Sequence, residues 1–250
     1  MKSAILTDLT RCIGCEACVM ACREINGLPR TSANHCLNAH TWTAIEYHQG
    51  VPVRRQCMQC EQPSCAAACP VGALIKTPEG AVIYDAGKCM GCRYCMIACP
   101  FGIPKYEWQA RIPRVQKCIF CYESALRQGK EPACTAACPS GATIYGEREA
   151  LIQEAQRRIA SYPQRYLSTL YGLTEAGGTS VLYLSAVPFE KLGFPAGIQH
   201  RPYSALTWQE LRRIPAVVSA GGAFLFGAWW IINRRITRAK ENEHSSGQHS

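Results

Sequence analysis

The apolar residues of the chain follow three patterns that predict different elements. The first lies near the C-terminus, where residues 214–232 (IPAVVSAGGAFLFGAWWII) carry no charged side chain. At about 1.5 Å per residue, a helix of this length spans roughly 28 Å, close to the thickness of a bilayer core. Arg212 and Arg213 precede the stretch, and four more basic residues follow it between 234 and 240. These observations predict a single transmembrane helix over residues 211–238, with a buried core helix as the alternative.

The other two patterns predict shorter elements upstream. Apolar residues at helical spacing, with acidic residues before them and arginines near the end, predict an amphipathic helix at 147–159. β-forming residues on both sides of a Thr-Pro-Glu-Gly turn predict a hairpin over 73–85. Residues 161–210 show no sustained period, so we expect 148–210 to comprise that helix and an extended arm that binds a partner protein. A disordered tail is expected over 239–250.

The composition adds one unusual feature, because seventeen of the 250 residues are cysteine. All but Cys36 fall into four runs of similar spacing, so internal repetition organises the chain. The runs are Cys12-x2-Cys15-x2-Cys18-x3-Cys22, Cys57-x2-Cys60-x4-Cys65-x3-Cys69, Cys89-x2-Cys92-x2-Cys95-x3-Cys99 and Cys118-x2-Cys121-x12-Cys134-x3-Cys138. Proline follows the last cysteine of runs two, three and four, whereas Arg23 takes that position in run one.

The spacing favours iron–sulfur chemistry over its competitors. Three cysteines at C-x2-C-x2-C wrap one face of an iron–sulfur cube, and a fourth, followed by proline, reaches the other cube of a two-cluster ferredoxin. A structural zinc site takes two separated pairs and leaves the third cysteine without a role. Disulfides tie distant segments together, and cysteines three apart are poor partners. Sixteen cysteines make four complete sets, so we predict four [4Fe–4S] clusters.

The order of the runs predicts how they pair into two ferredoxin-like units of an α+β fold. The hairpin at 73–85 joins runs two and three into one unit, nested at about 50–112. The connection from run three to run four contains three prolines and no such hairpin. Runs one and four then pair, with the AILT strand before Cys12 beside the ATIY strand after Cys138, in a four-cluster domain at 1–147. The alternative pairs run one with two and run three with four, and it keeps the same sixteen ligands.

Each cluster then takes three ligands from one run and the fourth from the partner run. We name the resulting sets groups A to D. Group A is Cys12, Cys15, Cys18 and Cys138, and group B is Cys118, Cys121, Cys134 and Cys22. Group C is Cys57, Cys60, Cys65 and Cys99, and group D is Cys89, Cys92, Cys95 and Cys69. Cys36 is left over, and we expect it to be a small buried apolar residue.

The formal charge of +9 treats every cysteine as neutral and so leaves out the charge of bound clusters. Four clusters, each with four thiolates, would carry about −2 apiece when oxidised, which lowers the net charge from +9 to about +1. The basic excess is therefore a counter-charge, and no nucleic-acid motif accompanies it. Arg11, Arg93 and Lys117 lie beside ligands and are expected to be solvated surface charges. The sequence shows no catalytic constellation, phosphate loop or flavin fingerprint, so the chain is predicted to carry electrons without transforming a substrate.

With the four runs in view, the chain resembles the four-cluster iron–sulfur subunits of molybdopterin-oxidoreductase and membrane-bound [NiFe]-hydrogenase complexes. The resemblance covers residues 1 to about 200 and rests on YCMIACPFGIPKYEW (94–108) and KCIFC…ACTAACPSGA (117–142). The block GGTSVLYLSAVPFEKLGF (177–194), followed by one C-terminal membrane helix, is similar to the formate dehydrogenase β subunit and to the iron–sulfur subunit of quinone-reducing hydrogenases. Its SAVPFEKLG segment favours the hydrogenase member. In this family, runs one and four share one unit and runs two and three share the other.

The resemblance implies an electron-transfer subunit of a respiratory complex of the hydrogenase or formate dehydrogenase type. The expected partners are catalytic large and small subunits, an integral membrane cytochrome b or quinone-binding subunit, and the lipid bilayer. The family implies a single-pass protein of the cytoplasmic membrane with its cluster domain on the periplasmic face. Four basic residues after the helix, against three before it, agree with a cytoplasmic C-terminus.

Two further expectations complete the interpretation. The N-terminal MKSAILTDLTRC has neither a hydrophobic core nor a cleavage site, so no cleavable signal peptide is predicted. The rival functions are a soluble polyferredoxin and an enzyme in its own right.

Overall fold

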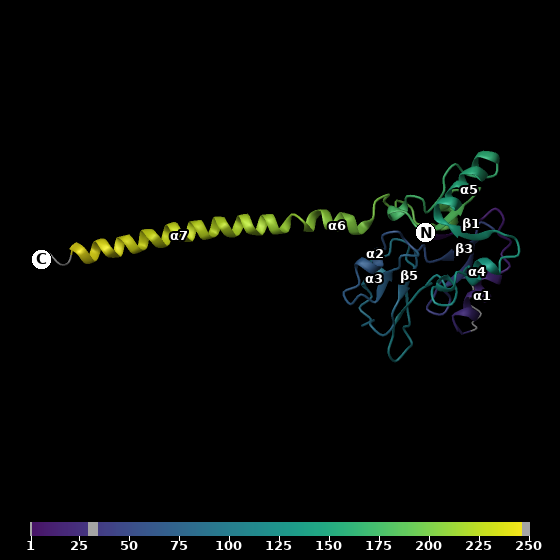
Figure 1. Cartoon of the computed structure of the whole chain (residues 1–250), viewed down its shortest axis with the longest axis horizontal. Helices are drawn as coiled ribbons and strands as arrows, with labels where there is room; N and C mark the ends of the chain where they lie inside the picture. Colours follow the sequence, from purple (N-terminus) through teal and green to yellow (C-terminus); the bar gives the residue numbers. More distant parts are fainter. Residues whose placement is uncertain (1, 30–34, 247–250) are drawn as a thin grey trace. The chain divides into compact units, whose positions relative to one another are not determined.

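The computed structural model describes residues 2–29 and 35–246, except for the side chains of 239–246. The chain divides into two compact units, residues 1–204 and residues 205–250. Figure 1 shows the strands and the short helices of the first unit, and the long helix α7 of the second.

A three-stranded sheet of order β8–β1–β9 ties distant parts of the first unit together. β1 (Ser3–Asp8) pairs antiparallel with β8 (Thr143–Glu147), so that Ile5 lies opposite Tyr145. The pairing predicted between the strand before run one and the strand after run four is confirmed. The sheet therefore joins the two ends of the cysteine-rich region.

β9 (Val181–Leu184) lies parallel to β1, on the side opposite β8. All four of its side chains are buried, and a short apolar run buried on both faces shows no alternation in the sequence. The structure therefore differs from the extended arm expected at 161–210, because part of that segment belongs to this chain's own sheet. Short 3₁₀ helices at Glu175–Gly177 and Phe189–Leu192 flank β9.

α5 (Arg148–Ser161) follows β8 directly and confirms the amphipathic helix predicted at 147–159. Its apolar face packs in one cluster with Leu6 of β1 and Leu182 of β9. The helix therefore covers one face of the sheet.

A buried carboxylate fastens this helix to the sheet. Asp8, at the end of β1, is fully buried and accepts hydrogen bonds from Arg158 Nη1 at 3.2 Å and Tyr166 Oη at 2.7 Å. Arg158 lies on α5 and Tyr166 follows it, so one side chain anchors two successive segments. A buried ion pair with additional hydrogen bonds is costly to break.

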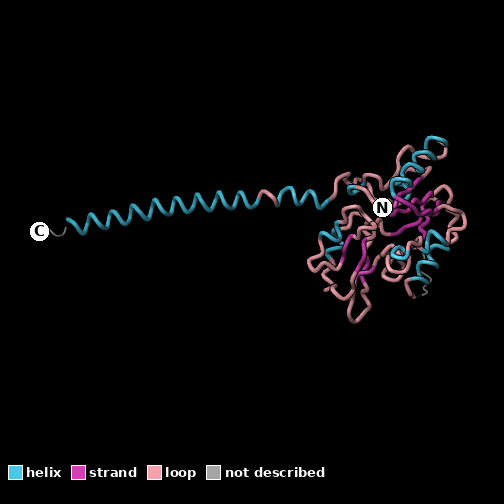
Figure 2. Tube along the Cα trace, in the orientation of Figure 1, coloured by secondary structure: helices cyan, strands magenta, loops and turns pink. Residues whose placement is uncertain are grey.

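Three hairpins surround the sheet, and Figure 2 shows their strands as magenta segments between longer loops. They are β2 (Thr43–His48) with β3 (Val51–Gln56), β4 (Leu74–Lys76) with β5 (Val82–Tyr84), and β6 (Lys105–Tyr106) with β7 (Val115–Gln116). The β4–β5 pair confirms the hairpin predicted over 73–85. The β6–β7 pair corrects the expectation of no hairpin between runs three and four. Pro104 and Pro113 lie just outside its short strands, where a missing N–H removes no ladder bond.

Each cysteine run contains a short helix whose second residue is the third cysteine of that run. These helices are α1 (Ala17–Ile25), α2 (Ser64–Ala67), α3 (Tyr94–Ala98) and α4 (Ala133–Ala136). A 3₁₀ helix, Leu126–Gln128, lies in the long insertion of run four. The helical turn fixes the backbone of the third cysteine in every run.

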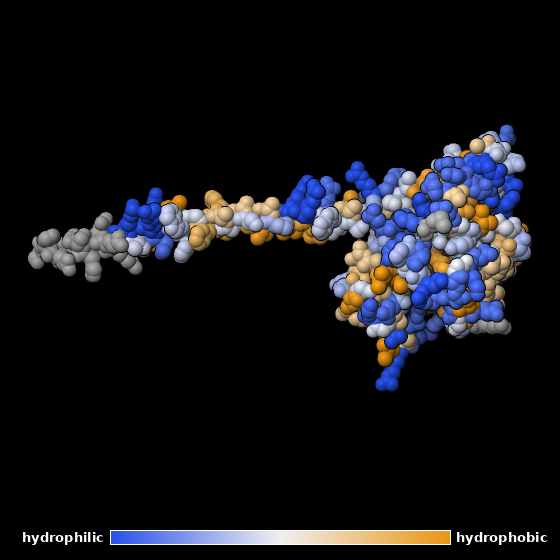
Figure 3. All heavy atoms as spheres, viewed as in Figure 1, coloured by the Kyte–Doolittle hydropathy of each residue, from blue (hydrophilic) through white to orange (hydrophobic). Residues whose placement is uncertain are grey.

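The second unit contains most of α6 (Tyr203–Leu211) and all of α7 (Ile214–Ser246). Residues 203–238 form the one candidate membrane span in the described part of the chain, and its apolar window is not buried by protein. Figure 3 shows hydrophobic side chains along the middle of α7, with hydrophilic ones on either side. This exposure argues against the alternative of a buried core helix.

The end of α7 differs from the tail predicted at 239–250. The helix continues to Ser246, because residues 239–243 (AKENE) contain neither glycine nor proline. Residues 247–250 lie outside the described residues.

Candidate iron–sulfur sites

All four runs share one backbone conformation between their first two cysteines. The residue before the second cysteine has a positive φ in every run: Gly14 (70°), Gln59 (52°), Gly91 (75°) and Phe120 (63°). This left-handed conformation is free of strain at glycine and sparsely populated by other residues. A Cβ at Gly14 or Gly91 would also press on the hydroxyl of Tyr47 or Tyr106. The runs therefore repeat one local geometry as well as one spacing.

The fourth cysteine of runs two, three and four begins a turn that glycine closes. The N–H groups of Gly72, Gly102 and Gly141 donate to the carbonyl oxygens of Cys69, Cys99 and Cys138 at 3.1–3.3 Å. Directly after the first of these turns, the N–H of Ala73 donates to Cys69 Sγ at 3.2 Å. Run one lacks this turn, because α1 continues past Cys22 to Ile25. N–H···S bonds of this kind stabilise a thiolate ligand.

Runs one and four meet at group A. Burial raises the pKa of Cys12, and the neighbouring thiols of Cys138 and Cys15 add to the rise. Burial also raises the pKa of Cys18, and Cys12 adds to that rise. Cys12 thus interacts with thiols of both run one and run four.

The same two runs meet again at group B. Burial raises the pKa of Cys22 to about 12, and the thiols of Cys134 and Cys121 add to the rise. The pKa of Cys118 is raised well above its ordinary value by burial and by the thiols of Cys22, Cys121 and Cys134. Cys22 of run one thus interacts with three thiols of run four.

Runs two and three meet at group C. Burial raises the pKa of Cys60 well above its ordinary value, and the thiols of Cys57, Cys99 and Cys65 add to this effect. Burial likewise raises the pKa of Cys65 to about 12, with contributions from Cys57 and Cys99. Thiols of run two thus interact with Cys99, the last cysteine of run three.

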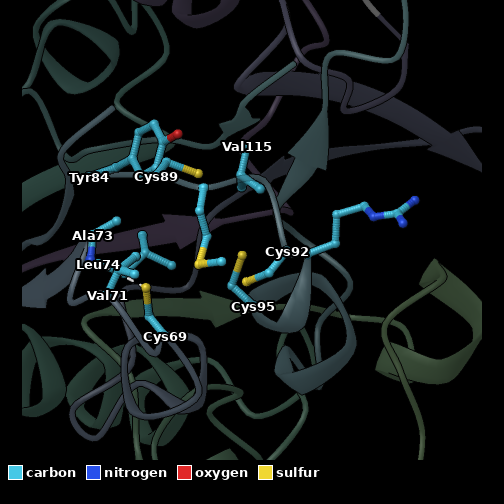
Figure 4. A pocket seen from close by; sticks show the side chains of 11 residues that line it. Cys69, Val71, Ala73, Leu74, Tyr84, Cys89, Cys92, Cys95 and Val115 are labelled. Carbon is cyan, nitrogen blue, oxygen red and sulfur yellow. Dashed lines mark hydrogen bonds between the residues drawn. The ribbon is translucent and has the colours of Figure 1, made fainter. Parts of the chain in front are cut away.

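Group D takes the remaining cysteines of runs two and three. Burial raises the pKa of Cys95 to about 11, and the thiols of Cys89, Cys69 and Cys92 add to it. Figure 4 shows the sulfur atoms of these four cysteines turned toward a common space. They line a pocket with about 310 Å³ of space that no atom fills, part of it open to solvent. Leu74, Val115 and other apolar side chains complete its wall.

Thiols of different groups also interact with one another. Cys18 of group A is close enough to Cys134 of group B for the thiol of Cys134 to raise its pKa, after burial. Cys57 of group C has the same effect on Cys118 of group B. Cys95 of group D acts in this way on Cys65 of group C. Neighbours therefore run from A to B, from B to C and from C to D.

The chemistry of these donors fits iron–sulfur clusters. All seventeen cysteines lie in the described part of the chain, and none of them forms a disulfide. Thiols that are buried side by side resist ionisation, because burial and mutual repulsion both raise their pKa. Bound iron would favour the deprotonated form, because its positive charge stabilises a thiolate ligand. The sixteen cysteines of the four runs supply the ligand type that [4Fe–4S] clusters require.

Comparison with known proteins leads to the same chemistry. The family model of the 4Fe-4S dicluster domain matches residues 49–148, which contain runs two, three and four. The chain is 34% identical to the hydrogenase-2 operon protein HybA of Escherichia coli O157:H7, over 97% of this chain and 86% of that protein. It is 35% identical to the iron–sulfur subunit of the nitrate-inducible formate dehydrogenase of Escherichia coli K12, over 72% of this chain and 67% of that protein. A protein of Nitratidesulfovibrio vulgaris Hildenborough is 38% identical, over 96% and 69%.

The chain belongs to this family of iron–sulfur electron-transfer subunits. Membership confirms the resemblance found in the sequence, with [4Fe–4S] clusters as its cofactor class. As a member of the family, the chain is an electron-transfer subunit of a respiratory oxidoreductase. Its ferredoxin-like region is accompanied by one candidate membrane-spanning helix.

Cys36 differs from its expected environment. The sequence predicts a buried apolar residue, whereas the structure places the thiol at the surface, in an irregular segment after α1. Segments of this kind run over protein surfaces, so their side chains are commonly exposed. Cys36 belongs to none of the four groups.

The basic residues beside the ligands divide into two kinds. Arg11 and Arg93 are exposed, as expected, and Arg93 lies over the rings of Tyr106 and Trp108. Lys117 corrects the expectation, because it is only 2% exposed. Its Nζ donates to the carbonyl oxygen of Cys118 at 2.9 Å and to that of Val82. Carbonyl oxygens of the turn and of β5 replace the water that a surface lysine would bind.

Sequence reasoning missed two other polar residues that contact the sites. Gln59 is fully buried between runs two and four, and Arg54 of β3 is buried near groups A and B. Polar residues within a few positions of a ligand cysteine are the one available signal. That signal does not separate Arg54 from its neighbour Arg55, which contacts other parts of the chain.

Proposed function

We propose that this chain holds four [4Fe–4S] clusters on the sixteen cysteines of groups A to D and relays electrons along them. The interactions among the thiols support the proposal, since cysteines of each proposed group raise one another's pKa across the two runs. The clusters, once bound, would supply one-electron uptake and release. The chain's own residues supply the thiolate ligands, the N–H groups that stabilise them and the burial that excludes water.

Two ferredoxin-like units follow from this assignment. One unit combines runs one and four around groups A and B, and the other combines runs two and three around groups C and D. The order A–B–C–D then forms a single path with groups A and D at its ends. The alternative pairing of run one with two and run three with four draws no such support from the thiol neighbours.

The two outer groups are the places where electrons enter and leave. Exposed apolar side chains flank both of them: Ile13 and Met20 in run one, and Met90 and Ile97 in run three. Exposed apolar patches mark protein interaction sites. A catalytic subunit would dock at one end, and an integral membrane cytochrome b or quinone-binding subunit at the other.

The chain would be anchored by α7 as a single-pass protein of the cytoplasmic membrane. The basic residues that follow the span outnumber those just before it, which favours a cytoplasmic C-terminus and a periplasmic cluster domain. A reporter enzyme fused to residue 250 tests this orientation. Activity of a reporter that works only in the periplasm would contradict it.

The catalytic partner would be a [NiFe] hydrogenase, and the chain itself would have no catalytic site. HybA, a protein of the hydrogenase-2 operon, matches nearly the full length of this chain. The second candidate is a formate dehydrogenase, because a formate dehydrogenase iron–sulfur subunit is similarly identical. Metal analysis of the purified complex separates them, since nickel indicates a hydrogenase and molybdenum or tungsten a formate dehydrogenase.

Iron and sulfide analysis of the anaerobically purified chain tests the cluster assignment. The expected result is about sixteen irons and sixteen labile sulfides per polypeptide. Zinc in their place, or iron for only two clusters, would overturn the proposal. Turnover of hydrogen or formate by the isolated chain with an artificial electron acceptor would overturn its non-catalytic part.

A further inference from the structure

Arg54 is the most deeply buried of the large charged side chains around the cysteine runs. It lies on β3 and is 1% exposed. Its Nη2 donates to Gln56 Oε1 at 2.6 Å, and its Nη1 donates to Thr7 Oγ1 at 3.4 Å. Its Nε is buried without a hydrogen-bond partner among the described residues. The guanidinium therefore has two neutral partners and one unsatisfied donor.

A buried guanidinium needs an opposite charge close by. Removing a cation from water costs several kcal/mol, even after the protein relaxes around it. Arginine does not escape this cost by losing its proton. Among the side chains that the structure describes, no carboxylate forms an ion pair with Arg54. The compensating negative charge must come from another source.

The groups around Arg54 that become anionic on ligation are thiols. Burial lowers the pKa of Arg54, yet the thiols of Cys134, Cys18 and Cys118 raise it above its ordinary value. Conversely, the positive charge of Arg54 lowers the pKa of thiols in both groups and so opposes the effect of burial. These thiols are Cys12 and Cys18 of group A, and Cys22 and Cys121 of group B. The guanidinium thus acts on thiols of both groups, and its neighbour Val53 in β3 belongs to the same core cluster as Cys18 of group A and Cys118 and Cys134 of group B.

Group C shows what a compensated cation looks like in the same protein. Lys76 acts on Cys60, and it also forms an ion pair with Glu61 at 3.6 Å. The carboxylate cancels much of the charge of Lys76. Arg54 has no such carboxylate, so its full charge is directed at the neighbouring sulfur ligands.

We propose that Arg54 is the shared counter-charge of clusters A and B and holds the reduction potentials of both above the values they would otherwise have. The inference rests on the proposed function, because it requires clusters in both groups. An electron added to a cluster makes it more negative, and a fixed positive charge nearby stabilises that reduced state. Arg54 is a positioning residue in this role, since it acts through the ligands and takes up no electron itself.

Redox titration of the purified full-length complex, followed by EPR of the reduced clusters, tests the proposal. Arg54→Met removes the charge at similar length, and Arg54→Lys keeps it. We expect Arg54→Met to shift the reduction equilibrium of two of the four clusters at least tenfold toward the oxidised form, about 59 mV for a one-electron couple. The other two midpoints should not move. Arg54→Lys should keep all four midpoints near their wild-type values.

Arg55→Met is the matched control on the same strand. Arg55 pairs with Glu46 at 3.4 Å and donates to the carbonyl oxygen of Gly193 at 2.9 Å. Its removal changes the formal charge by the same amount as removal of Arg54. The four midpoints of this variant should match those of the wild type. Equal shifts in the two methionine variants would overturn the proposal, because general charge would then explain the effect.

Other results of the redox and iron measurements also test the proposal. Unchanged midpoints in Arg54→Met, or equal shifts in all four clusters, contradict a counter-charge specific to A and B. Loss of half the iron in Arg54→Met, but not in Arg54→Lys, supports it, because charge is what separates the two variants. Loss in both variants contradicts it. The iron content of the wild type is measured first, so a failure of the four-cluster assignment is recognised independently.

Discussion

The side-chain amide of Gln59 donates a hydrogen bond to the carbonyl oxygen of Cys118 at 3.0 Å. Its oxygen accepts a second bond from the N–H of Val82 at 2.6 Å, and the whole side chain is buried. One residue therefore joins the run that supplies most of group C to the run that supplies most of group B. It also holds β5 against both.

We expect Gln59→Ala to lower the free energy of unfolding by about 1–3 kcal/mol, because it leaves the buried N–H of Val82 without its partner and removes one of the two donors to the carbonyl oxygen of Cys118. In a protein of this size, each kcal/mol lowers the melting temperature by about 2–4 °C. Anaerobic melting, followed by the loss of visible cluster absorbance, measures the change. Gln62→Ala changes an exposed residue of the same run and should melt like the wild type. Identical melting of both variants would show that the amide contributes nothing.

Single cysteine changes test the proposed ligands. Cys69→Ala removes a thiol that faces the common space of group D, and it should reduce the iron content below about sixteen per chain. Cys36→Ala removes an exposed thiol outside all four groups and should leave the iron content unchanged. Iron and labile sulfide are measured after anaerobic purification of both variants. Equal iron in the two would exclude Cys69 as a ligand.

The buried carboxylate at the end of β1 gives a stability prediction that is independent of the clusters. Asp8→Ala should lower the free energy of unfolding by about 3 kcal/mol, the low end for breaking a buried ion pair. The cost stays low because Arg158 keeps Glu154 as a second partner at 2.7 Å. Asp85→Ala, which breaks an exposed pair with Lys88, should cost less than about 1 kcal/mol. Melting temperatures of the two variants measure the difference, and the prediction is wrong if their order is reversed.

Membrane insertion of α7 can be tested within the full chain. Leu225→Arg places a charge near the middle of the apolar stretch and should make insertion less favourable by about 2.5–3.5 kcal/mol. We expect part of the chain to move from the membrane fraction to the soluble fraction. Thr237→Arg adds the same charge among the basic residues beyond the stretch and should stay in the membrane. Full retention of Leu225→Arg in washed membranes would argue against a spanning helix.

Features with a local signal could be predicted from the sequence. The β4–β5 hairpin, α5 and the partner strands β1 and β8 follow from turn residues, helical spacing and short apolar runs. The proposed ligand cysteines rest on their spacing, and they stay a prediction. β9 and the β6–β7 hairpin were missed for a physical reason. A strand buried on both faces has no alternation, and a two-residue ladder is too short to show a pattern.

Arg54 and Arg55 show why the surroundings of the clusters could not be predicted. The two residues are adjacent and identical in type, yet one is fully buried and the other pairs with Glu46. Successive side chains of a strand point to opposite faces, but local sequence does not say which face of β3 is covered. The packing of runs one and four decides it, and that packing depends on contacts between residues far apart in the chain.

The position of β1 between β8 and β9 also sets an order for maturation. β1 cannot pair with either neighbour until more than a hundred further residues have been synthesised. The nested ligand sets C and D are complete once Cys99 has been synthesised, whereas A and B need Cys138 and Cys134. Under the proposed assignment, the ligands of C and D would therefore be available before those of A and B. A nascent chain arrested after Cys99 and before Cys134 would then hold complete ligand sets for C and D only, and the electron path would lack A and B.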